Sequence, residues 1–168
     1  SFLQSRWWDT PTPLYRASLC DAAGPWADLR YEEDWEYDCR IAAFGTKLHF
    51  CEAYVAEVRD HDQGRLCRGD PRDPERLSHR ARAQRMILEH ATRAGISAEV
   101  PEMQHFARAL FLLARQCGAA GLGTESCELF LRSRVASGSA RAGGLDFRIY
   151  RLAAAILGWS LAGRLACA

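Results

Sequence analysis

Five carboxylates lie within seven residues, from Glu32 to Asp38, with one tryptophan upstream at Trp26 and another inside the cluster at Trp35. Such carboxylates can accept a proton from an incoming hydroxyl, hold a metal ion, or hydrogen-bond sugar hydroxyls while an aromatic ring covers the sugar's apolar face. Exposed acidic caps are usually surrounded by small polar residues, whereas carboxylates beside tryptophan are typical of a polar cleft. Both a polar cleft and a solvated acidic cap stay open, and the sequence alone favours the cap.

A helix is expected to position this cluster. Over residues 34–44, Tyr37, Ile41 and Phe44 recur at helical spacing, and a glycine follows. The acidic residues then lie at the helix N-terminus, where free backbone N–H groups and the helix dipole stabilise anions. Asp34 begins this helix on a short side chain, which makes it the candidate general base.

The composition is that of a folded domain, because 48% of the 168 residues are hydrophobic and 26% are charged. A net charge of +1 gives no whole-chain argument for nucleic acid or a membrane. The charge is unevenly divided, however. Residues 1–63 hold 12 acids and 6 bases, and residues 64–168 hold 9 acids and 16 bases, so the two parts carry −6 and +7. This asymmetry predicts two segments with different roles.

The seven cysteines are odd in number and show no C-x-x-C spacing, so neither a zinc module nor a disulfide framework is predicted. We expect most of them to be small buried residues in a reducing cytosol. The histidines at His79, His90 and His105 predict no metal site. The chain opens on Ser1 in a tryptophan-rich stretch with no signal peptide, and we interpret it as a piece of a longer protein.

The expected fold class is α+β, mostly α-helical. Residues 1–63 are predicted to alternate strands and helices, namely a strand over 12–16, a helix over 17–23, the acidic helix, and a strand over 47–59. Residues 64–74 form a linker rich in glycine and proline. Residues 75–168 are predicted to be a helical C-terminal segment whose helices begin near residue 74 and cover 74–94, 101–117, 124–135 and 146–165, with a flexible loop over 137–144.

The last predicted helix contains an apolar run of 11 residues, 152–162. A membrane-spanning helix needs roughly 20 such residues. We therefore expect a helix that faces the core or a partner, with contact to a membrane surface as the alternative. The arginines of the first long helix are expected to be solvated or, alternatively, to touch acidic lipid headgroups; they are Arg76, Arg80, Arg82, Arg85 and Arg93.

Several short motifs occur in order over residues 7–61: Trp7-Trp8, Pro13-Leu14-Tyr15-Arg16, Ala23-Gly24-Pro25-Trp26, Glu33-Asp34-Trp35-Glu36, Arg40, Gly45 and Val55-Ala56-Glu57-Val58-Arg59-Asp60-His61. In type, order and spacing they resemble the acceptor half of a family 2 inverting glycosyltransferase with a GT-A fold. The resemblance covers about 55 of the 168 residues. It implies that the α/β part of this chain is a partial GT-A domain.

The resemblance also assigns roles to the acceptor side. Asp34 would remove the proton from the acceptor hydroxyl as that hydroxyl attacks the anomeric carbon, and Glu33 would orient or tune it. Trp26, Trp35 and Arg16 would shape the acceptor cleft. The acceptor would be a saccharide or a lipid-linked saccharide.

The donor side follows from the same resemblance. Arg59 and His61 would lie near the nucleotide diphosphate, with a plain polar pair at a strand end as the alternative. The full-length enzyme would use a nucleotide-sugar donor and Mg²⁺ or Mn²⁺, held by a D-x-D motif that is not in this chain and should precede Ser1. This chain alone is expected to be inactive. Its expected location is cytoplasmic, with the inner face of the membrane as a further option.

A second, non-enzymatic function stays open. In this alternative the chain is a helical interaction module with an acidic N-terminal appendage, and its tryptophans are core residues. The two functions predict different surroundings for Asp34: a cleft walled by Trp26 or Trp35, or an open convex surface.

Overall fold

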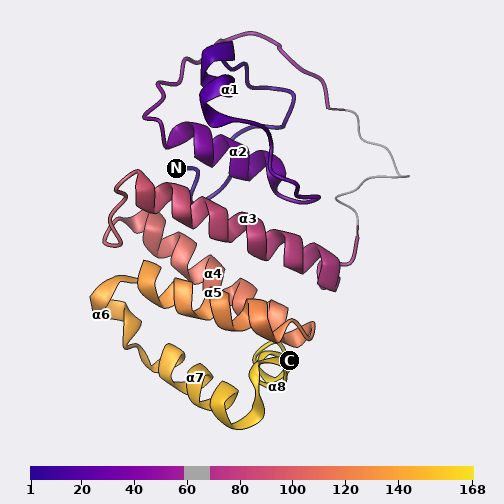
Figure 1. Cartoon of the computed structure of the whole chain (residues 1–168), viewed down its shortest axis with the longest axis vertical. Helices are drawn as coiled ribbons and strands as arrows, with labels where there is room; N and C mark the ends of the chain where they lie inside the picture. Colours follow the sequence, from indigo (N-terminus) through magenta and orange to yellow (C-terminus); the bar gives the residue numbers. More distant parts are fainter. Residues whose placement is uncertain (59–68) are drawn as a thin grey trace.

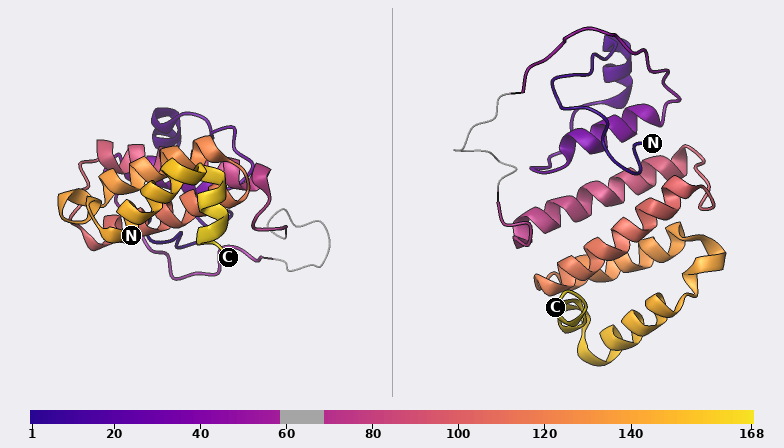
Figure 2. Two further views of the ribbon diagram at one scale, coloured as in Figure 1. Left: turned by 90° about the horizontal axis from the view of Figure 1, so that it is seen from below. Right: turned by 180° about the vertical axis from the view of Figure 1, so that it is seen from behind.

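The computed structural model describes residues 1–58 and 69–168, and every regular element within them is a helix (Figure 1). The helices are α1 (Ala17–Ala23), α2 (Glu33–Ala42), α3 (Pro74–Arg93), α4 (Pro101–Ala119), α5 (Gly123–Ala136), α6 (Gly138–Ala142), α7 (Leu145–Leu157) and α8 (Trp159–Ala166). They lie in successive layers, with α1 and α2 at one end, then α3, then α4 and α5, and α7 with α8 at the other end (Figure 2).

The expected α+β class is wrong, because the described residues form no strand and no part of a GT-A sheet. The predicted strands over 12–16 and 47–58 run as irregular chain instead. A strand is stable only beside another strand that pairs with its backbone N–H and C=O groups, and no described segment supplies one. The apolar side chains of both segments therefore stay exposed, such as Leu14 at 98%, Phe50 at 83% and Tyr54 at 100%.

The two predicted N-terminal helices do form, within one or two residues of their expected ends. α1 ends at Gly24, whose φ of 75° is easily adopted only without a Cβ. α2 begins at Glu33, after Glu32 in the left-handed region at φ 60°. Asp34 is thus the second residue of α2, in its first turn.

The long C-terminal helices also form where the sequence predicts them. Asp73 caps α3, because its side chain accepts a hydrogen bond of 2.9 Å from the backbone N–H of Arg76, and Pro74 takes the first helical position. α4 likewise opens on Pro101.

The end of the chain differs from its prediction. The expected flexible loop over 137–144 contains the short helix α6, and the expected single helix over 146–165 is divided into α7 and α8. The division falls at Gly158, which has a φ of 81° and is therefore outside the helical region. None of the described helices is long and apolar enough to cross a membrane.

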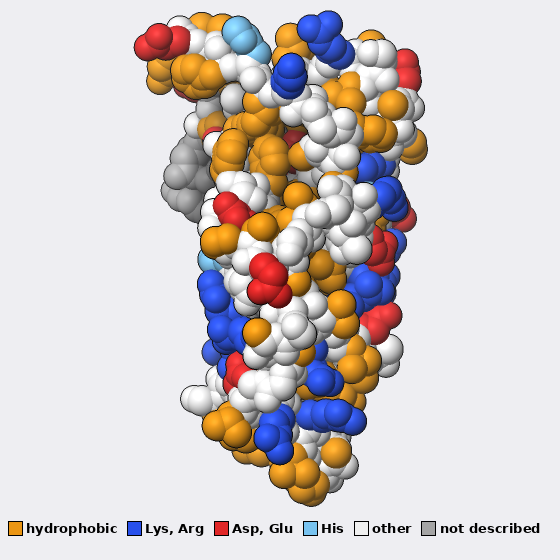
Figure 3. Space-filling view, turned by 90° about the vertical axis from the view of Figure 1, so that its left-hand side faces the viewer, with side chains coloured by type: hydrophobic (Ala, Val, Ile, Leu, Met, Phe, Trp, Pro, Cys, Tyr) orange, Lys and Arg blue, Asp and Glu red, His pale blue; other side chains and the backbone are white. Residues whose placement is uncertain are grey.

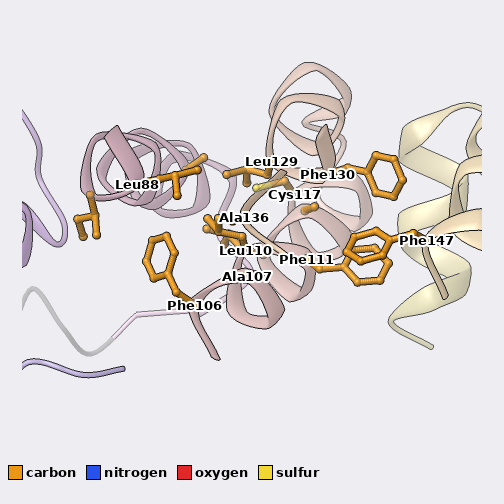
Figure 4. Packing of buried hydrophobic residues seen from close by; sticks show 14 of the residues in the cluster. Leu88, Phe106, Ala107, Leu110, Phe111, Cys117, Leu129, Phe130, Ala136 and Phe147 are labelled. Carbon is orange, nitrogen blue, oxygen red and sulfur yellow. The ribbon is translucent and has the colours of Figure 1, made fainter. Parts of the chain in front are cut away.

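The main core lies between α3, α4, α5 and α7, where bulky side chains are almost wholly removed from water. Leu77 and Ile87 come from α3, Phe106 and Leu110 from α4, and Phe130 from α5. Aromatic rings extend the core toward α7 and α8: Phe111 stacks on Phe147 at 4.7 Å, and both rings also contact Phe130 (Figure 4).

A pair of glycines lets α8 cross α4 at close range. A Cβ added to Gly163 would lie 2.5 Å from the backbone N of Ala119, and one added to Gly118 would lie 2.6 Å from the carbonyl oxygen of Trp159. Both obstacles are backbone atoms that cannot move aside. The crossing therefore requires glycine at both positions.

Candidate functional site

Asp34, the candidate base, is held by three hydrogen bonds. Its Oδ2 accepts one of 2.6 Å from Arg6 Nη1 and one of 2.5 Å from the Thr10 hydroxyl, and its Oδ1 accepts one of 2.7 Å from the backbone N–H of Trp35. The Asp34 side chain is 21% exposed and the Arg6 side chain 16%. The carboxylate is therefore fixed in orientation and paired with a cation, and it is largely removed from water.

Asp38, one turn further along α2, is almost fully buried with its own donors. Its Oδ2 accepts hydrogen bonds from Arg6 Nε at 2.7 Å and from the Trp8 indole N–H at 3.0 Å, and its Oδ1 accepts one from the Tyr15 hydroxyl. Burial, and then the bond to Asp38, raise the pKa of the Tyr15 phenol above its ordinary value of 10.0. Arg6 thus bridges Asp34 and Asp38, and ties the N-terminal loop to α2.

Glu36 has no exposed surface and two charged or ionisable partners. Arg40 binds it from one turn later through Nε at 3.0 Å and through Nη2, and His90 Nε2 of α3 lies 2.6 Å from its Oε1. Burial alone would raise the pKa of the Glu36 carboxyl, but the hydrogen bonds from His90 and Arg40 outweigh it and lower that pKa. Arg40 also donates to the carbonyl oxygens of Ala23 and Pro25, which closes the loop after α1.

Glu32 connects the same region to α3 by a second route. Its carboxylate accepts a hydrogen bond of 2.6 Å from Arg80 Nε and one of 2.5 Å from Gln84 Nε2. Glu33 is half-buried, and burial is the main cause that raises the pKa of its carboxyl. Four of the five clustered acids therefore have partners inside the protein.

The predicted acceptor-side residues are placed differently from one another. The Trp35 indole points inward and donates a hydrogen bond of 2.8 Å to the carbonyl oxygen of Phe2. Trp26 is 45% exposed and stacks on Tyr37 with ring centroids 5.2 Å apart. Arg16 is exposed just before α1. The predicted diphosphate residues, Arg59 and His61, lie outside the described residues.

Several residues that complete this network were not predicted to take part in it: Arg6 and Thr10 were not singled out from the sequence, Tyr15 was named only within a motif, and His90 only as a histidine without a metal site. Arg6 lies 28 residues before Asp34 in an irregular loop, and His90 lies 54 residues after Glu36. Helical periodicity relates residues three or four positions apart and says nothing about such long-range partners. The sequence did offer one indication of this network, which is the number of carboxylates. Five neighbouring carboxylates require several nearby hydrogen-bond donors if they are buried.

An apolar pocket of about 630 Å³ opens beside this network, between α2, α3 and the first residues of the chain. Phe2, Trp7, Leu48 and Ile87 contribute to its walls, together with His90. Cys39 lines it as well, and burial raises the pKa of its thiol to about 12, so the thiol is not a ready nucleophile. Neither Glu33 nor Asp34 lines this pocket.

The side chains of residues 1–58 and 69–168 form no group of three or more His, Cys, Asp or Glu that could hold a metal ion. The resemblance expects Mg²⁺ or Mn²⁺ to be held by a D-x-D motif outside this chain, so this finding does not bear on that expectation, and the chemistry proposed below uses only side chains of this chain. Comparisons of the chain with protein-family models, with curated proteins and with solved structures find no match. The function must therefore be argued from the residues and their geometry.

Proposed function

We propose that this chain is the acceptor-side part of an inverting glycosyltransferase of the family 2 type, and that Asp34 is its general base. The proposal rests on the ordered motifs of residues 7–61 and on the surroundings of Asp34. The strands that the resemblance implies over 12–16 and 47–58 do not form in the described structure, so the fold does not support the proposal and only the motifs and the position of Asp34 do. The donor would be a nucleotide sugar, and the acceptor hydroxyl would belong to a saccharide or a lipid-linked saccharide.

The observation that carries the proposal is the way Asp34 is held. An ionised carboxylate has about four acceptor positions, and Arg6, Thr10 and Trp35 occupy three of them. One position on Oδ1 is left for a further donor. A general base must reach the proton of a bound hydroxyl, and a carboxylate fixed by three bonds, partly exposed and with one acceptor position unused supports this role.

The reaction would proceed in one displacement. The acceptor O–H gives its proton to Asp34 as the oxygen forms a bond to the anomeric carbon, and the bond from that carbon to the diphosphate breaks. The nucleoside diphosphate leaves with the electron pair. Attack from the face opposite the leaving group inverts the anomeric centre.

The neighbouring residues would have supporting roles. Glu33, with its raised pKa, would tune the charge beside Asp34. Trp26 has half-exposed ring surface that suits the apolar face of a sugar, and Arg16 would contact acceptor hydroxyls. Trp35 would act through the inward packing of its ring, which fixes the start of α2.

The test is an assay of the natural protein that contains this chain, with whatever the coding sequence adds before Ser1, against a panel of labelled nucleotide sugars. Asp34→Asn keeps the shape and the bonds to Arg6 and Thr10 but removes the base, so transfer should fall about a thousandfold. Asp9→Asn is the matched control, because Asp9 is exposed and should leave transfer unchanged. Near-normal transfer by Asp34→Asn would contradict the role of Asp34.

A second function, a helical interaction module, is favoured by one observation. Glu32, Asp34, Glu36 and Asp38 all have partners inside the protein, which is what a purely structural acidic cluster needs. In that case the natural protein transfers no sugar from any donor.

A further inference from the structure

The outer surface of α7 is apolar although nothing in the described structure covers it. On the inner side of this helix, Phe147, Tyr150 and Ala154 are buried against the core. On the opposite side Leu145, Ile149, Leu152 and Ile156 follow the helical period and are 71%, 66%, 63% and 72% exposed. We call these four residues the α7 outer face. A helix with one apolar side on the core has no need of a second one for folding.

Arginines accompany the α7 outer face. Arg148 and Arg151 of α7 and Arg164 of α8 are exposed, and within the described ranges no ion pair engages any of the three. The one acid of α7, Asp146, lies 3.6 Å from Arg141 and is thereby paired. Hydrophobic side chains gather at the lower end of the molecule, below a group of Lys and Arg side chains (Figure 3). The surface is thus both apolar and positively charged.

Two arginines of α3, by contrast, have acidic partners within the protein. Arg80 pairs with Glu32 at 2.6 Å, and Arg85 pairs with Glu128 at 2.7 Å. For these two arginines, the alternative expectation that α3 touches acidic lipid headgroups is weakened. Arg82 and Arg93 are exposed, and no ion pair within the described ranges engages them, so unpaired positive charge lies on α3 as well as at α7 and α8. At α7 this charge accompanies an exposed apolar face.

We propose that the α7 outer face binds the surface of a membrane that contains anionic lipids, with α7 lying parallel to the membrane plane. Its four apolar side chains would enter the boundary between headgroups and acyl chains, while Arg148, Arg151 and Arg164 would pair with lipid phosphates. The 13 residues of α7 span about 20 Å, so this helix lies on a bilayer and does not cross it. This inference does not depend on the proposed function.

Charge selects the lipid surface over a second copy of the chain. If two copies met through the α7 outer face about a two-fold axis, Arg148 and Arg151 of both copies would flank one interface. Four like charges would then share a partly desolvated region without acids to pair them, which is unfavourable. An anionic membrane offers the opposite charge over the whole length of the helix.

Flotation of the whole protein with vesicles tests the proposal. Vesicles of phosphatidylcholine alone would be compared with vesicles of equal parts phosphatidylcholine and phosphatidylglycerol, at low and high salt. The protein should bind the anionic vesicles, bind the neutral ones weakly, and lose binding as salt screens the arginines. Ile149→Glu combined with Leu152→Glu should lower partitioning at least tenfold.

The charge contribution is measured separately. Arg148→Ala and Arg151→Ala should each lower partitioning into anionic vesicles about fivefold and leave binding to neutral vesicles unchanged. Two matched controls change exposed residues that are not on α7 or α8: Leu131→Glu on α5, whose leucine is 51% exposed, and Arg108→Ala on α4. Both should bind as the parent does. A circular-dichroism melt of every variant establishes that it is folded, and all substitutions are at exposed positions.

Two outcomes would overturn the proposal. One is equal partitioning of the parent and the Ile149→Glu, Leu152→Glu variant. The other is a dimer in sedimentation equilibrium that this variant converts to a monomer, with no vesicle binding by the parent. The second result would make the α7 outer face an interface between copies of the chain.

Discussion

The two ends of the molecule are stabilised by different interactions. Around α2, buried carboxylates are matched by arginines, a histidine and hydroxyls, as in the groups Arg6–Asp38–Tyr15 and Arg40–Glu36–His90. Around α4 and α5, packed rings and aliphatic chains exclude water, with Phe106 and Phe130 at their centre. Removal of one partner from a buried ionic group leaves a charge without compensation. Removal of a ring from an apolar core leaves a cavity.

This contrast indicates different kinds of specificity. Apolar packing tolerates exchanges of similar volume, whereas each carboxylate near α2 accepts bonds from donors at fixed positions. The N-terminal region is therefore expected to have one defined geometry, and the stability of that geometry is expected to depend on pH. The C-terminal helices are expected to have most of the stability.

The largest expected effect is in the aromatic core. Phe130 is fully buried and its ring contacts Phe111, Phe147, Tyr150 and Trp159. Phe130→Ala should lower the free energy of unfolding by about 4 kcal/mol, because it removes transfer energy and opens a cavity. Denaturant titration measures this loss. The neighbouring Leu131→Ala, at a half-exposed position, should cost less than about 1 kcal/mol, and equal losses would show that the core is not centred on Phe130.

A somewhat smaller effect is expected at the buried carboxylate. Glu36→Ala removes the shared partner of Arg40 and His90 and should cost about 3 kcal/mol. Hydrogen exchange should show that amides of α1 and α2 lose protection while those of α4 and α5 keep theirs. The exposed Glu52→Ala is the control. Equal loss of protection in α4 and α5 would mean that the two regions unfold as one unit. Their different interactions would then not give them different stabilities.

The smallest effect is expected on acidification. The folded-state pKa of Glu36 lies below its ordinary value of 4.5, so its contribution to stability is complete above that value and is lost as pH falls through the lower folded-state pKa. Protonation keeps the side chain in place, so the loss should be less than for Glu36→Ala. An acid titration followed by hydrogen exchange should show α2 opening before α4. Glu36→Gln should remove this part of the pH dependence, and an unchanged acid transition in that variant would contradict the assignment.

The helices were predictable because their signals are local. Asp73 and Pro74 mark the start of α3, and the apolar period of α4 marks its buried face. The error at the end of the chain is also a local matter, because a single glycine at 158 does not reveal from sequence whether its φ is positive. The prediction of a continuous helix there was wrong for that reason.

The strands and the network were not predictable for a different reason. Residues 47–58 have the alternation of a strand, yet a strand requires a partner, and alternation says nothing about whether one is present. The cluster over 32–38 was identified from the sequence as a place where several carboxylates lie close together. Its partners Arg6 and His90 could not be identified, because tertiary packing brings them close and no spacing in the sequence encodes that.

The contact between Gly118 and Gly163 has a consequence for how this sequence can change over time. Every substitution of either glycine by another amino acid adds at least one carbon where backbone atoms already lie within 2.6 Å. No compensating replacement of a neighbouring side chain can make room, since the obstacle is main chain. Both glycines must therefore be kept for α8 to cross α4 in this way. A related protein in which one of them is replaced must place its last helix differently.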